Sequence, residues 1–420
     1  MAPVAAAASP VYRSCVSSAD SAVWRISTER SRLIVRTAFV STYPPRRCGI
    51  ATFTRDLAAA TGHREIVAVH PPEQLDPYPI EVHHRIRRDE PTDYVRAARA
   101  LDSCVEVVSI QHEYGIWGGE DGESVLDFIG ALRTPVVTTL HTVLREPTYR
   151  QRAILTELVA SSDATVVMSR SAATLLAETY GVDASRLDVV PHGVPDLPLV
   201  DPATVKSSLG VEGRDVILSF GLLGPGKGYE LALEALPAVV AAHPAACYVV
   251  VGATHPDLIR TEGEAYRERL VAQVQRLGLE RHVRFVDRFV GRVELTRWLE
   301  AADVFVTPYP RLDQIVSGTL SYAMGAGRAI VSTPYTYAAE LLADGRGMLV
   351  PSGSASALAE ALNDVLGDPE MRRELGKRAY AYSRRMVWSA VGAEYRRLLE
   401  RLTTKTAQRV AAGSLAAVNV

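Results

Sequence analysis

Cysteine is scarce in this sequence, and its four copies form no recognisable site. Cys15, Cys48, Cys104 and Cys247 lie far apart and include no CxxC pair or metal-ligand spacing. The sequence therefore indicates neither a disulfide framework nor a zinc site, and we expect no metal. Unpaired thiols are typical of a reducing compartment, so we expect a cytoplasmic protein.

Long apolar runs and an excess of one charge are also missing. No run approaches the roughly 18 apolar residues that suggest a membrane-spanning helix. The 46 basic residues are balanced by 48 acidic ones, which gives no support for nucleic acid as a partner. Residues 1–31 are rich in Ala and Ser but lack the basic start of a signal peptide, and we expect a flexible tail there.

From residue 32 onward, short β-rich runs alternate with amphipathic stretches. This alternation predicts an α/β protein whose parallel sheets are covered by helices on both faces. The expected strands of a first series are 33–41, 65–70, 106–111, 135–141 and 164–169. Those of a second series are 215–221, 246–252, 282–287, 303–308, 328–333 and 347–351.

A proline-rich stretch at residues 191–202 separates the two series and marks a linker. We therefore expect two doubly wound, Rossmann-like domains, residues 32–200 and 201–385, that face one another across a central cleft. Residues 386–402 are expected to form a helix that crosses back to the first domain. Residues 403–420 are small and polar, and we expect a disordered tail there.

Two stretches of the second domain favour binding of phosphate groups. The run GLLGPGKG at residues 221–228 places Lys227 in a glycine-rich turn before a helix, where anions are favoured. The alternative is a strand-to-helix turn with a solvated lysine. Ser317, Gly318 and Thr319 open a small-residue helix and leave N–H groups free, or serve only to cap it. Together the two helix starts predict a site for one diphosphate.

These motifs resemble the retaining GT-B glycosyltransferases of the large family 4 group. The resemblance covers roughly residues 33–400 and joins the lysine turn to YAMGAGRAIVSTP at residues 322–334. In the first domain, YPPRRCGIATFTRDLA at residues 43–58 is similar to the family's glycine loop and PVVTTLH at 135–141 to its histidine-ending strand. The resemblance implies a GT-B fold and transfer of a hexose from a nucleotide diphosphate sugar without a metal or other cofactor.

Three positions depart from the family pattern. Leu222 stands where the family usually carries an arginine, and Gln314 and Tyr322 stand where it carries two glutamates that contact the donor sugar and the ribose. The resemblance places Gln314 at the sugar and Tyr322 at the ribose or the phosphates. The implied donor-site residues are Gly49, Arg47, Gly221, Gly226, Lys227, Gln314, Ser317, Gly318, Thr319 and Tyr322. Arg46 and Arg47 are the candidates to replace the missing cation, or are surface arginines.

The remaining candidates lie in the first domain. His141 ends a strand, where its ring could bond a sugar hydroxyl or serve only the structure. Glu113 follows another strand, and Tyr114 and Trp117 after it could stack on an acceptor sugar. The alternative is a loop with a capping carboxylate before a helix at 123–132. A basic patch at residues 83–90 is either a solvated edge strand or a contact for an anionic acceptor or a membrane surface.

The resemblance thus implies a glycosyltransferase whose catalytic candidates are Lys227, His141, Gln314 and Glu113. Its expected partners are a nucleotide-sugar donor and a carbohydrate or glycoconjugate acceptor. Two alternatives stay open on the same fold: a glycoside phosphorylase that uses free phosphate, and a non-catalytic sugar-nucleotide-binding protein. The sequence does not reveal the base, the sugar, the acceptor or the oligomeric state.

Overall fold

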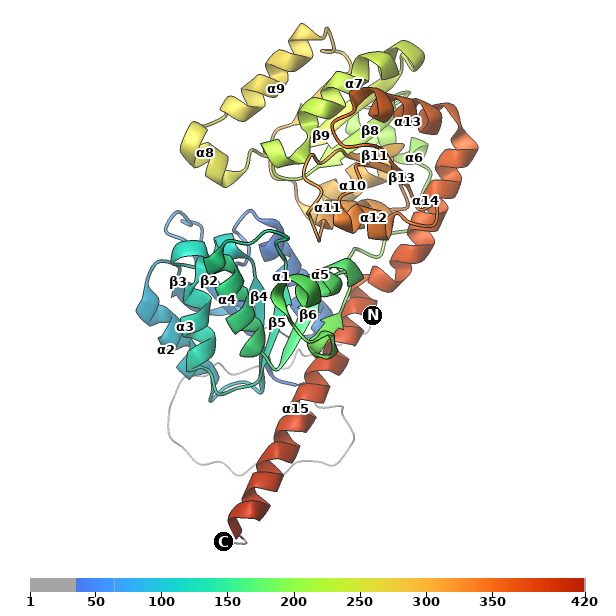
Figure 1. The fold of residues 1–420 in the computed structure, drawn as a ribbon. Coiled ribbons are helices and arrows are strands. Elements are labelled where there is room, and N and C mark those ends of the chain that lie inside the picture. Colours follow the sequence, from blue (N-terminus) through green and yellow to red (C-terminus); the bar gives the residue numbers. More distant parts are fainter. Residues whose placement is uncertain (1–34, 64, 419–420) are drawn as a thin grey trace, which may run out of the picture.

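The computed structural model describes residues 35–63 and 65–418, so the tail expected at residues 1–31 lies outside the described residues. The described chain forms two domains, each built on one parallel sheet with helices on both faces (Figure 1). The two doubly wound domains expected from the alternating pattern are therefore confirmed.

The first sheet has seven strands in the order β3-β2-β1-β4-β5-β6-β7, and all neighbours are parallel. Its central strands are buried on both faces, which explains their nearly continuous apolar sequences. Their bounds are β1 (Thr37–Ser41), β2 (Glu65–His70), β3 (Val82–Arg87), β4 (Val107–His112), β5 (Val136–Leu140), β6 (Ala164–Val167) and β7 (Leu187–Val189). The three-residue β7 was not among the expected strands, and β3 was expected only as one of two alternatives for the basic patch at residues 83–90.

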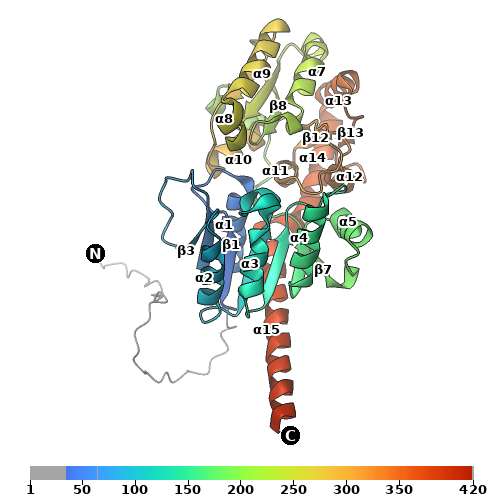
Figure 2. The same ribbon diagram turned by 60° about the vertical axis from the view of Figure 1, so that its left-hand side comes forward.

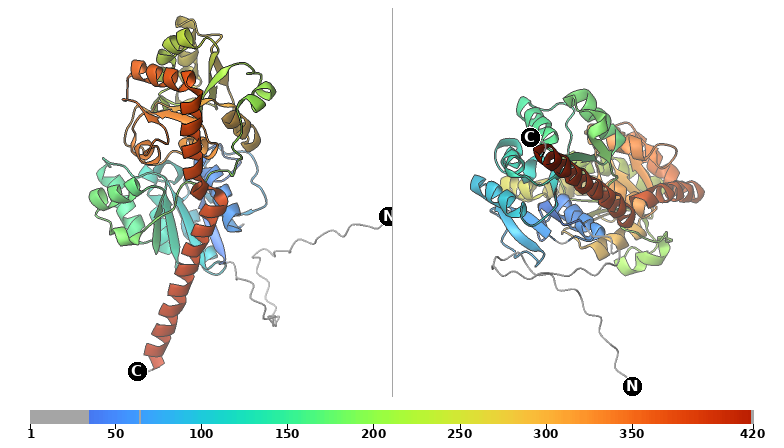
Figure 3. Two further views of the ribbon diagram at one scale, coloured as in Figure 1. Left: turned by 90° about the vertical axis from the view of Figure 1, so that its right-hand side faces the viewer. Right: turned by 90° about the horizontal axis from the view of Figure 1, so that it is seen from below.

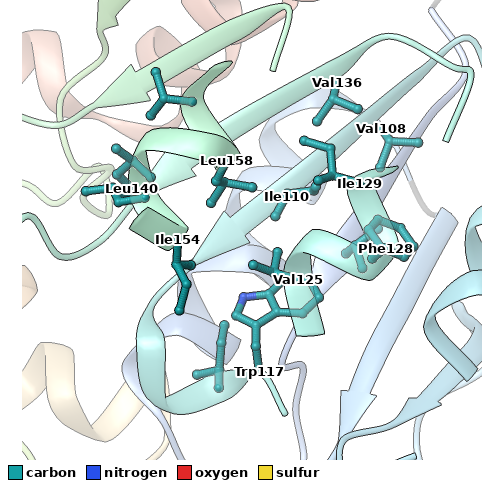
Figure 4. Close-up of a cluster of buried hydrophobic side chains, with 14 of the residues drawn as sticks. Val108, Ile110, Trp117, Val125, Phe128, Ile129, Val136, Leu140, Ile154 and Leu158 are labelled. Carbon is teal, nitrogen blue, oxygen red and sulfur yellow. The ribbon is translucent and has the colours of Figure 1, made fainter. Parts of the chain in front are cut away.

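Two apolar clusters cover this sheet. Helices α2 to α5 pack on one face, and Figure 4 shows part of that cluster around Trp117. The other face is covered by α1 and by the C-terminal helix α15, which lies behind the sheet in Figure 2. The first-domain helices are α1 (Gly49–Thr61), α2 (Pro91–Leu101), α3 (Ser124–Ala131), α4 (Tyr149–Ala160) and α5 (Arg170–Tyr180), with 3-10 turns at Tyr114–Ile116, Glu120–Gly122 and Ala184–Arg186.

The second sheet has six parallel strands in the order β10-β9-β8-β11-β12-β13. The strand order reverses direction between β8 and β11. The carboxyl ends of the strands at such a reversal are the usual position of a ligand site in an open parallel sheet. The strand bounds are β8 (Asp215–Phe220), β9 (Ala246–Val251), β10 (Val283–Val286), β11 (Val304–Thr307), β12 (Ala329–Ser332) and β13 (Met348–Leu349).

Helices again cover both faces of the second sheet, α7, α9 and α13 on one and α10, α11, α12 and α14 on the other. Their bounds are α6 (Ala203–Lys206), α7 (Tyr229–Ala242), α8 (Pro256–Glu262), α9 (Ala265–Arg276), α10 (Arg292–Ala301), α11 (Gly318–Gly325), α12 (Thr336–Leu341), α13 (Ala355–Gly367) and α14 (Pro369–Ser383). Further 3-10 turns lie at Ser207–Leu209, Pro225–Lys227 and Arg384–Met386.

The chain passes between the domains twice, and the two passages lie side by side. Val194 N donates to Met386 O at 2.8 Å, and Trp388 N donates to Val194 O at 3.0 Å. Gly193 lies against the ring of Trp388, where a Cβ atom would be only 2.2 Å from the nearest ring carbon. The linker and the return crossing are thus packed as one unit.

Helix α15 (Trp388–Val418) returns along the first domain, as the left panel of Figure 3 shows. Tyr395 anchors it, because its hydroxyl lies 2.7 Å from Ser109 Oγ on β4. The helix continues through residue 418, whereas a disordered tail was expected from residue 403, so that expectation was wrong for residues 403–418. The Ala, Lys, Gln and Arg residues of this stretch are strong helix formers and extend the helix begun on the domain. Across the described residues, no helix has the length and apolar character needed to cross a bilayer.

Candidate functional site

The lysine loop, residues 221–228, connects β8 to α7 in the second domain. Gly228 adopts a left-handed conformation with φ of 67°, and a Cβ atom there would lie 2.0 Å from Pro308 O. Glycine is therefore required where the loop enters α7. Lys227 ends a 3-10 turn just before this glycine, and among the described residues its ammonium has no carboxylate partner. Its charge is available to an anion.

The SGT step, Ser317 to Thr319, forms the start of α11. Ser317 is the N-cap, and its Oγ accepts a hydrogen bond from Leu320 N at 3.3 Å. The N–H groups of Gly318 and Thr319 belong to the first turn, in which no carbonyl of the helix is available to accept them. Unpaired donors and the positive end of the helix dipole together favour an anion at this point.

Tyr309, which follows β11, brings the lysine loop and the SGT step together. The Nζ atom of Lys227 lies 4.5 Å from the centre of the Tyr309 ring, and the Tyr309 hydroxyl lies 2.9 Å from Thr319 Oγ1. Gly221 adjoins the same threonine, because a Cβ atom there would lie 3.4 Å from Thr319 Cγ2. Gly226 has open space around its Cα. The two stretches that the sequence suggested for one diphosphate are thus neighbours in space.

Gln314 and Tyr322 lie on either side of the SGT step. Gln314 Nε2 donates to Val316 O at 2.8 Å, so the amide holds the turn that leads to Ser317. Tyr322 lies in α11, half-buried, with its ring centre 6.1 Å from that of His192 and 6.2 Å from that of Phe220. Burial raises the pKa of Tyr322, which keeps its hydroxyl protonated. Neither side chain supplies a negative charge.

His192 reaches this patch from the interdomain linker and was not among the residues expected from the sequence. Its Nε2 would lie only 2.9 Å from a Cβ atom at Gly318, so the ring borders the start of α11. Its Nδ1 lies 2.8 Å from Gly193 O, and burial lowers its pKa to about 4. The strand that precedes it, β7, was not among the expected strands, so the position after a strand that singled out His141 did not single out His192.

His141 follows β5 in the first domain. Its Nε2 lies 2.9 Å from Gln111 Oε1, and because an amide oxygen only accepts, Nε2 carries the proton. The ring also meets Phe53 edge-on, with 4.8 Å between ring centres. Burial first, and then His192 and His112, lower the pKa of His141 to about 3. The ring is therefore neutral near pH 7 and offers hydrogen bonding without charge.

The glycine loop of the first domain lies at the start of α1. Cys48 is the N-cap, and its Sγ accepts a hydrogen bond from Ala51 N at 3.2 Å. No heavy atom lies within 4 Å of a Cβ built on Gly49, which leaves room beside the helix start. Arg47 is exposed, whereas Arg46 is partly enclosed and its Nη1 has no hydrogen-bond partner among the described residues. Of the two candidate cations, Arg46 has the more enclosed charge.

The loop at residues 109–124 differs from the expected stacking platform. Trp117 is 3% exposed and packs in the core shown in Figure 4, with its Nε1 donating to Gln111 O at 3.2 Å. Tyr114 is also buried, and its hydroxyl donates to Gln151 O at 3.2 Å. Neither ring is free to stack on a sugar, because both fill the space between the loop and α3 or α4. The expectation of stacking at these two residues was therefore wrong.

Glu113 caps the 3-10 turn in this loop, as the alternative interpretation of the sequence had it. Its Oε2 accepts a hydrogen bond from Gly115 N at 2.8 Å. Burial raises its pKa, an effect opposed by these backbone hydrogen bonds and by the charge of Arg46. Next to Glu113, a hollow of about 350 Å³ is lined by Arg88, Asp89, Tyr114, Gly115, Trp117, Gly118, Gly119, Asp121 and Gly122.

The basic patch at residues 83–90 lies on β3, at the edge of the first sheet. Two of its three arginines are paired locally: Arg87 with Asp93 at 2.8 Å, and Arg88 with Asp89 at 2.9 Å. His83 Nδ1 lies 3.1 Å from Glu65 Oε2. These pairs favour the interpretation as a solvated edge strand.

Two protein-family models match the chain, one in each domain. The model described as Glycosyl transferases group 1 matches residues 202–382, and that of Glycosyltransferase Family 4 matches residues 49–196. Together the two models take in the lysine loop, the SGT step, His141 and the part of the glycine loop that begins at Gly49.

Curated relatives and solved structures agree with these models. The chain is 27% identical over 311 residues to D-inositol 3-phosphate glycosyltransferase of Segniliparus rotundus, which covers 69% of this chain and 66% of the relative. It is 29% identical over 237 residues to phosphatidyl-myo-inositol mannosyltransferase of Mycolicibacterium smegmatis, which covers 56% of this chain and 57% of the relative. It thus spans less than two thirds of the length of both relatives. HepE of Anabaena in complex with UDP has the same fold, with a TM-score of 0.70 at 18% identity over 87% of this chain and 100% of that one.

Proposed function

The chain belongs to the family-4-like glycosyltransferases of GT-B fold, and on that premise we propose that it transfers a hexose from a nucleotide diphosphate sugar to a carbohydrate or glycoconjugate acceptor, with retention of configuration. One observation carries the proposal. Lys227 lies over the ring of Tyr309, and Thr319 of the SGT step contacts its hydroxyl, so that two separate strand-to-helix connections present a cation and free N–H groups to one anion.

The chemistry that this site supports is stabilisation of a departing diphosphate. In glycosyl transfer the bond between the sugar and the diphosphate breaks, so negative charge grows on the leaving phosphate oxygens. Lys227 and the N–H groups of Gly318 and Thr319 are held by the fold before reaction and need little rearrangement to meet that charge. No metal or organic cofactor is needed for this role.

The other candidates are assigned to the sugar and the acceptor. Gln314 supplies an amide to donor hydroxyls, and His141 supplies a neutral ring at the end of β5. Arg46 adds positive charge from the first domain, because Leu222 supplies none at the position where the family carries an arginine. The acceptor lies on the first-domain side near Glu113 and the hollow beside it. The names of the two curated relatives, both glycosyltransferases acting on inositol-containing molecules, support an acceptor with a polyol ring.

A thermal-shift screen tests the proposal directly. UDP, GDP and ADP and their glucose and mannose conjugates are added to the wild type and to Lys227→Ala, with inorganic phosphate plus disaccharides as a separate arm. A bound donor at a hundred times its Kd should stabilise the wild type by about 2.7 kcal/mol. Product analysis by NMR with the best donor then reports the anomeric configuration.

The screen separates the three functions considered. Stabilisation by a nucleotide sugar followed by its turnover with an acceptor supports the transferase. Stabilisation and turnover only with phosphate and a disaccharide would identify a phosphorylase. Donor binding without turnover, over a broad panel of polyol and sugar acceptors, would identify a binding protein.

A further inference from the structure

Tyr309 is held in place from three directions. Its ring stacks on that of Tyr335, with 4.9 Å between ring centres and 18° between planes. Its carbonyl accepts a hydrogen bond from Thr333 Oγ1 at 2.6 Å, and its hydroxyl lies 2.9 Å from Thr319 Oγ1. The side chain is 3% exposed. A residue fixed in this way is a rigid support and not a mobile surface group.

The free face of this ring carries Lys227. An ammonium 4.5 Å from the ring centre and a ring stacked at 4.9 Å cannot occupy the same face, so Lys227 and Tyr335 lie on opposite sides of Tyr309. Lysine has a flexible side chain, and its ammonium is attracted to the electron-rich face of an aromatic ring. The ring therefore restricts the positions that the Lys227 charge can take.

The hydroxyl of the same tyrosine acts on the other half of the site. It bonds Thr319 Oγ1, which lies 3.1 Å from Ser317 Oγ, the N-cap of α11. The side chain of Tyr309 therefore contacts both the Lys227 ammonium and the first turn of α11. These two elements are far apart in the chain, and the side chain of Tyr309 links them.

We propose that Tyr309 is a positioning residue that sets the distance between the Lys227 ammonium and the start of α11, so that both meet one diphosphate. The inference deepens the proposed function and rests on it, because Tyr309 acts through Lys227 and Thr319 and not on the donor.

Double-mutant cycles on diphosphate binding test the proposal. UDP and GDP are titrated by calorimetry into the wild type, Tyr309→Leu, Lys227→Ala and the double variant. Tyr309→Leu should weaken binding about tenfold, within the range of a partly desolvated cation–π contact. In the Lys227→Ala background the same change should weaken it less than about threefold, since the charge that the ring holds is gone. If Tyr309→Leu weakened diphosphate binding by a further tenfold in the Lys227→Ala background, Tyr309 would not act through Lys227. The loss would then reflect a general structural defect.

A second cycle keeps the aromatic ring and so does not depend on Tyr309→Leu being folded. Tyr309→Phe retains the face on which Lys227 lies and loses only the bond to Thr319. It should weaken diphosphate binding by no more than about threefold, and this loss should vanish in a Thr319→Val background. Additive losses of Tyr309→Phe and Thr319→Val would contradict the inference.

Matched controls distinguish this inference from the function on which it rests. Tyr180→Phe removes the hydroxyl of a buried tyrosine in the first domain, which donates to Leu144 O at 2.9 Å away from the site, so diphosphate binding should stay unchanged. Uridine and guanosine, which lack phosphates, should bind wild type and Tyr309→Leu equally. If neither UDP nor GDP binds the wild type more tightly than Lys227→Ala, the proposed function itself is wrong. If Lys227→Ala weakens binding and Tyr309→Leu does not, only the role of Tyr309 is wrong.

Discussion

Glu340 in the second domain caps a helix of the first domain through Ser171. Its Oε2 accepts hydrogen bonds from Ser171 N at 2.8 Å and from Ser171 Oγ at 2.7 Å, and its Oε1 accepts one from Arg170 N at 3.0 Å. These N–H groups open α5 and have no acceptor within the helix. Nearby, Ile315, which precedes the SGT step by two residues, packs in the apolar core of the first domain.

Removing this contact should loosen the domain interface. Glu340→Ala leaves the start of α5 without its acceptor, and we expect a loss of about 1–2 kcal/mol of stability, typical of a lost helix cap with a charged partner. Glu340→Gln keeps an acceptor and should lose less. Chemical unfolding measures both, with Glu360→Ala on the exposed side of α13 as the control. Equal stabilities of Glu340→Ala and the control would show that the contact contributes nothing.

Lys227 should be needed for turnover and not for folding. Lys227→Ala removes the cation of the lysine loop, and the loss of one such group from a charge-stabilising site raises the barrier by roughly 3–4 kcal/mol, or about 10²–10³ in rate. Gly228 keeps the loop conformation, so the melting temperature should stay close to that of the wild type. Lys377→Ala, on the exposed surface of α14, is the control for loss of a lysine charge. Unchanged turnover at saturating donor would remove Lys227 from the site.

Chelation should leave activity intact. Among the described residues, no group of three or more His, Cys, Asp or Glu side chains is arranged to hold a metal ion. Positive charge and N–H groups from the protein are expected to take the role that a cation has in other transferases. Initial rates with and without EDTA, followed by addition of magnesium or manganese, measure this. Activity lost with EDTA and restored by either ion would contradict the metal-independent assignment.

His112 should make the protein less stable in acid. The side chain is fully buried, burial lowers its pKa to about 3, and neither ring nitrogen has a hydrogen-bond partner among the described residues. Below the unfolded value near 6.5, the unfolded chain binds a proton that the folded chain excludes, so stability falls as the pH drops from about 6.5 toward 3, by up to about 1.4 kcal/mol per unit.

Replacing this histidine should therefore flatten the acid side of the stability profile. His112→Phe keeps a ring against Tyr114, whose ring centre lies 5.0 Å away, and removes the titrating group. Unfolding free energies at pH 7.5 and 5 should differ less in His112→Phe than in the wild type, while His84→Gln on the edge strand should behave as the wild type. An unaltered slope in His112→Phe would rule out His112 as the cause.

Restoring the family's glutamates should not improve the enzyme. Tyr322 is packed between His192 and Phe220, and Gln314 holds the turn before the SGT step, so two carboxylates there would be poorly solvated and would face the donor phosphates. We expect Gln314→Glu/Tyr322→Glu to be slower with the wild-type donor, and Gln314→Ala to lose roughly 1.5–3 kcal/mol of barrier stabilisation. A faster double variant would mean that the wild-type site is a degraded one.

The sequence by itself determined the elements and the local chemistry. Short apolar runs that alternate with amphipathic stretches predicted the strands of both parallel sheets, because a strand buried on two faces must be apolar along its length. The glycine-rich turn around Lys227 and the cap at Ser317 could likewise be predicted from the sequence, since turn and cap preferences are mainly local. His141 was found by the same logic, as a polar residue at a strand end.

Only the tertiary structure decided which of these residues meet. No local sequence pattern indicated that Trp117 faces the core or that His192 borders Gly318. None indicated that Tyr309 contacts both Lys227 and Thr319. Such contacts join residues far apart in the chain, and they are selected by the packing of whole sheets and helices and not by the preference of any short segment. The C-terminal helix shows the same limit, because its small polar end becomes helical as the extension of a segment anchored on the first domain by Tyr395.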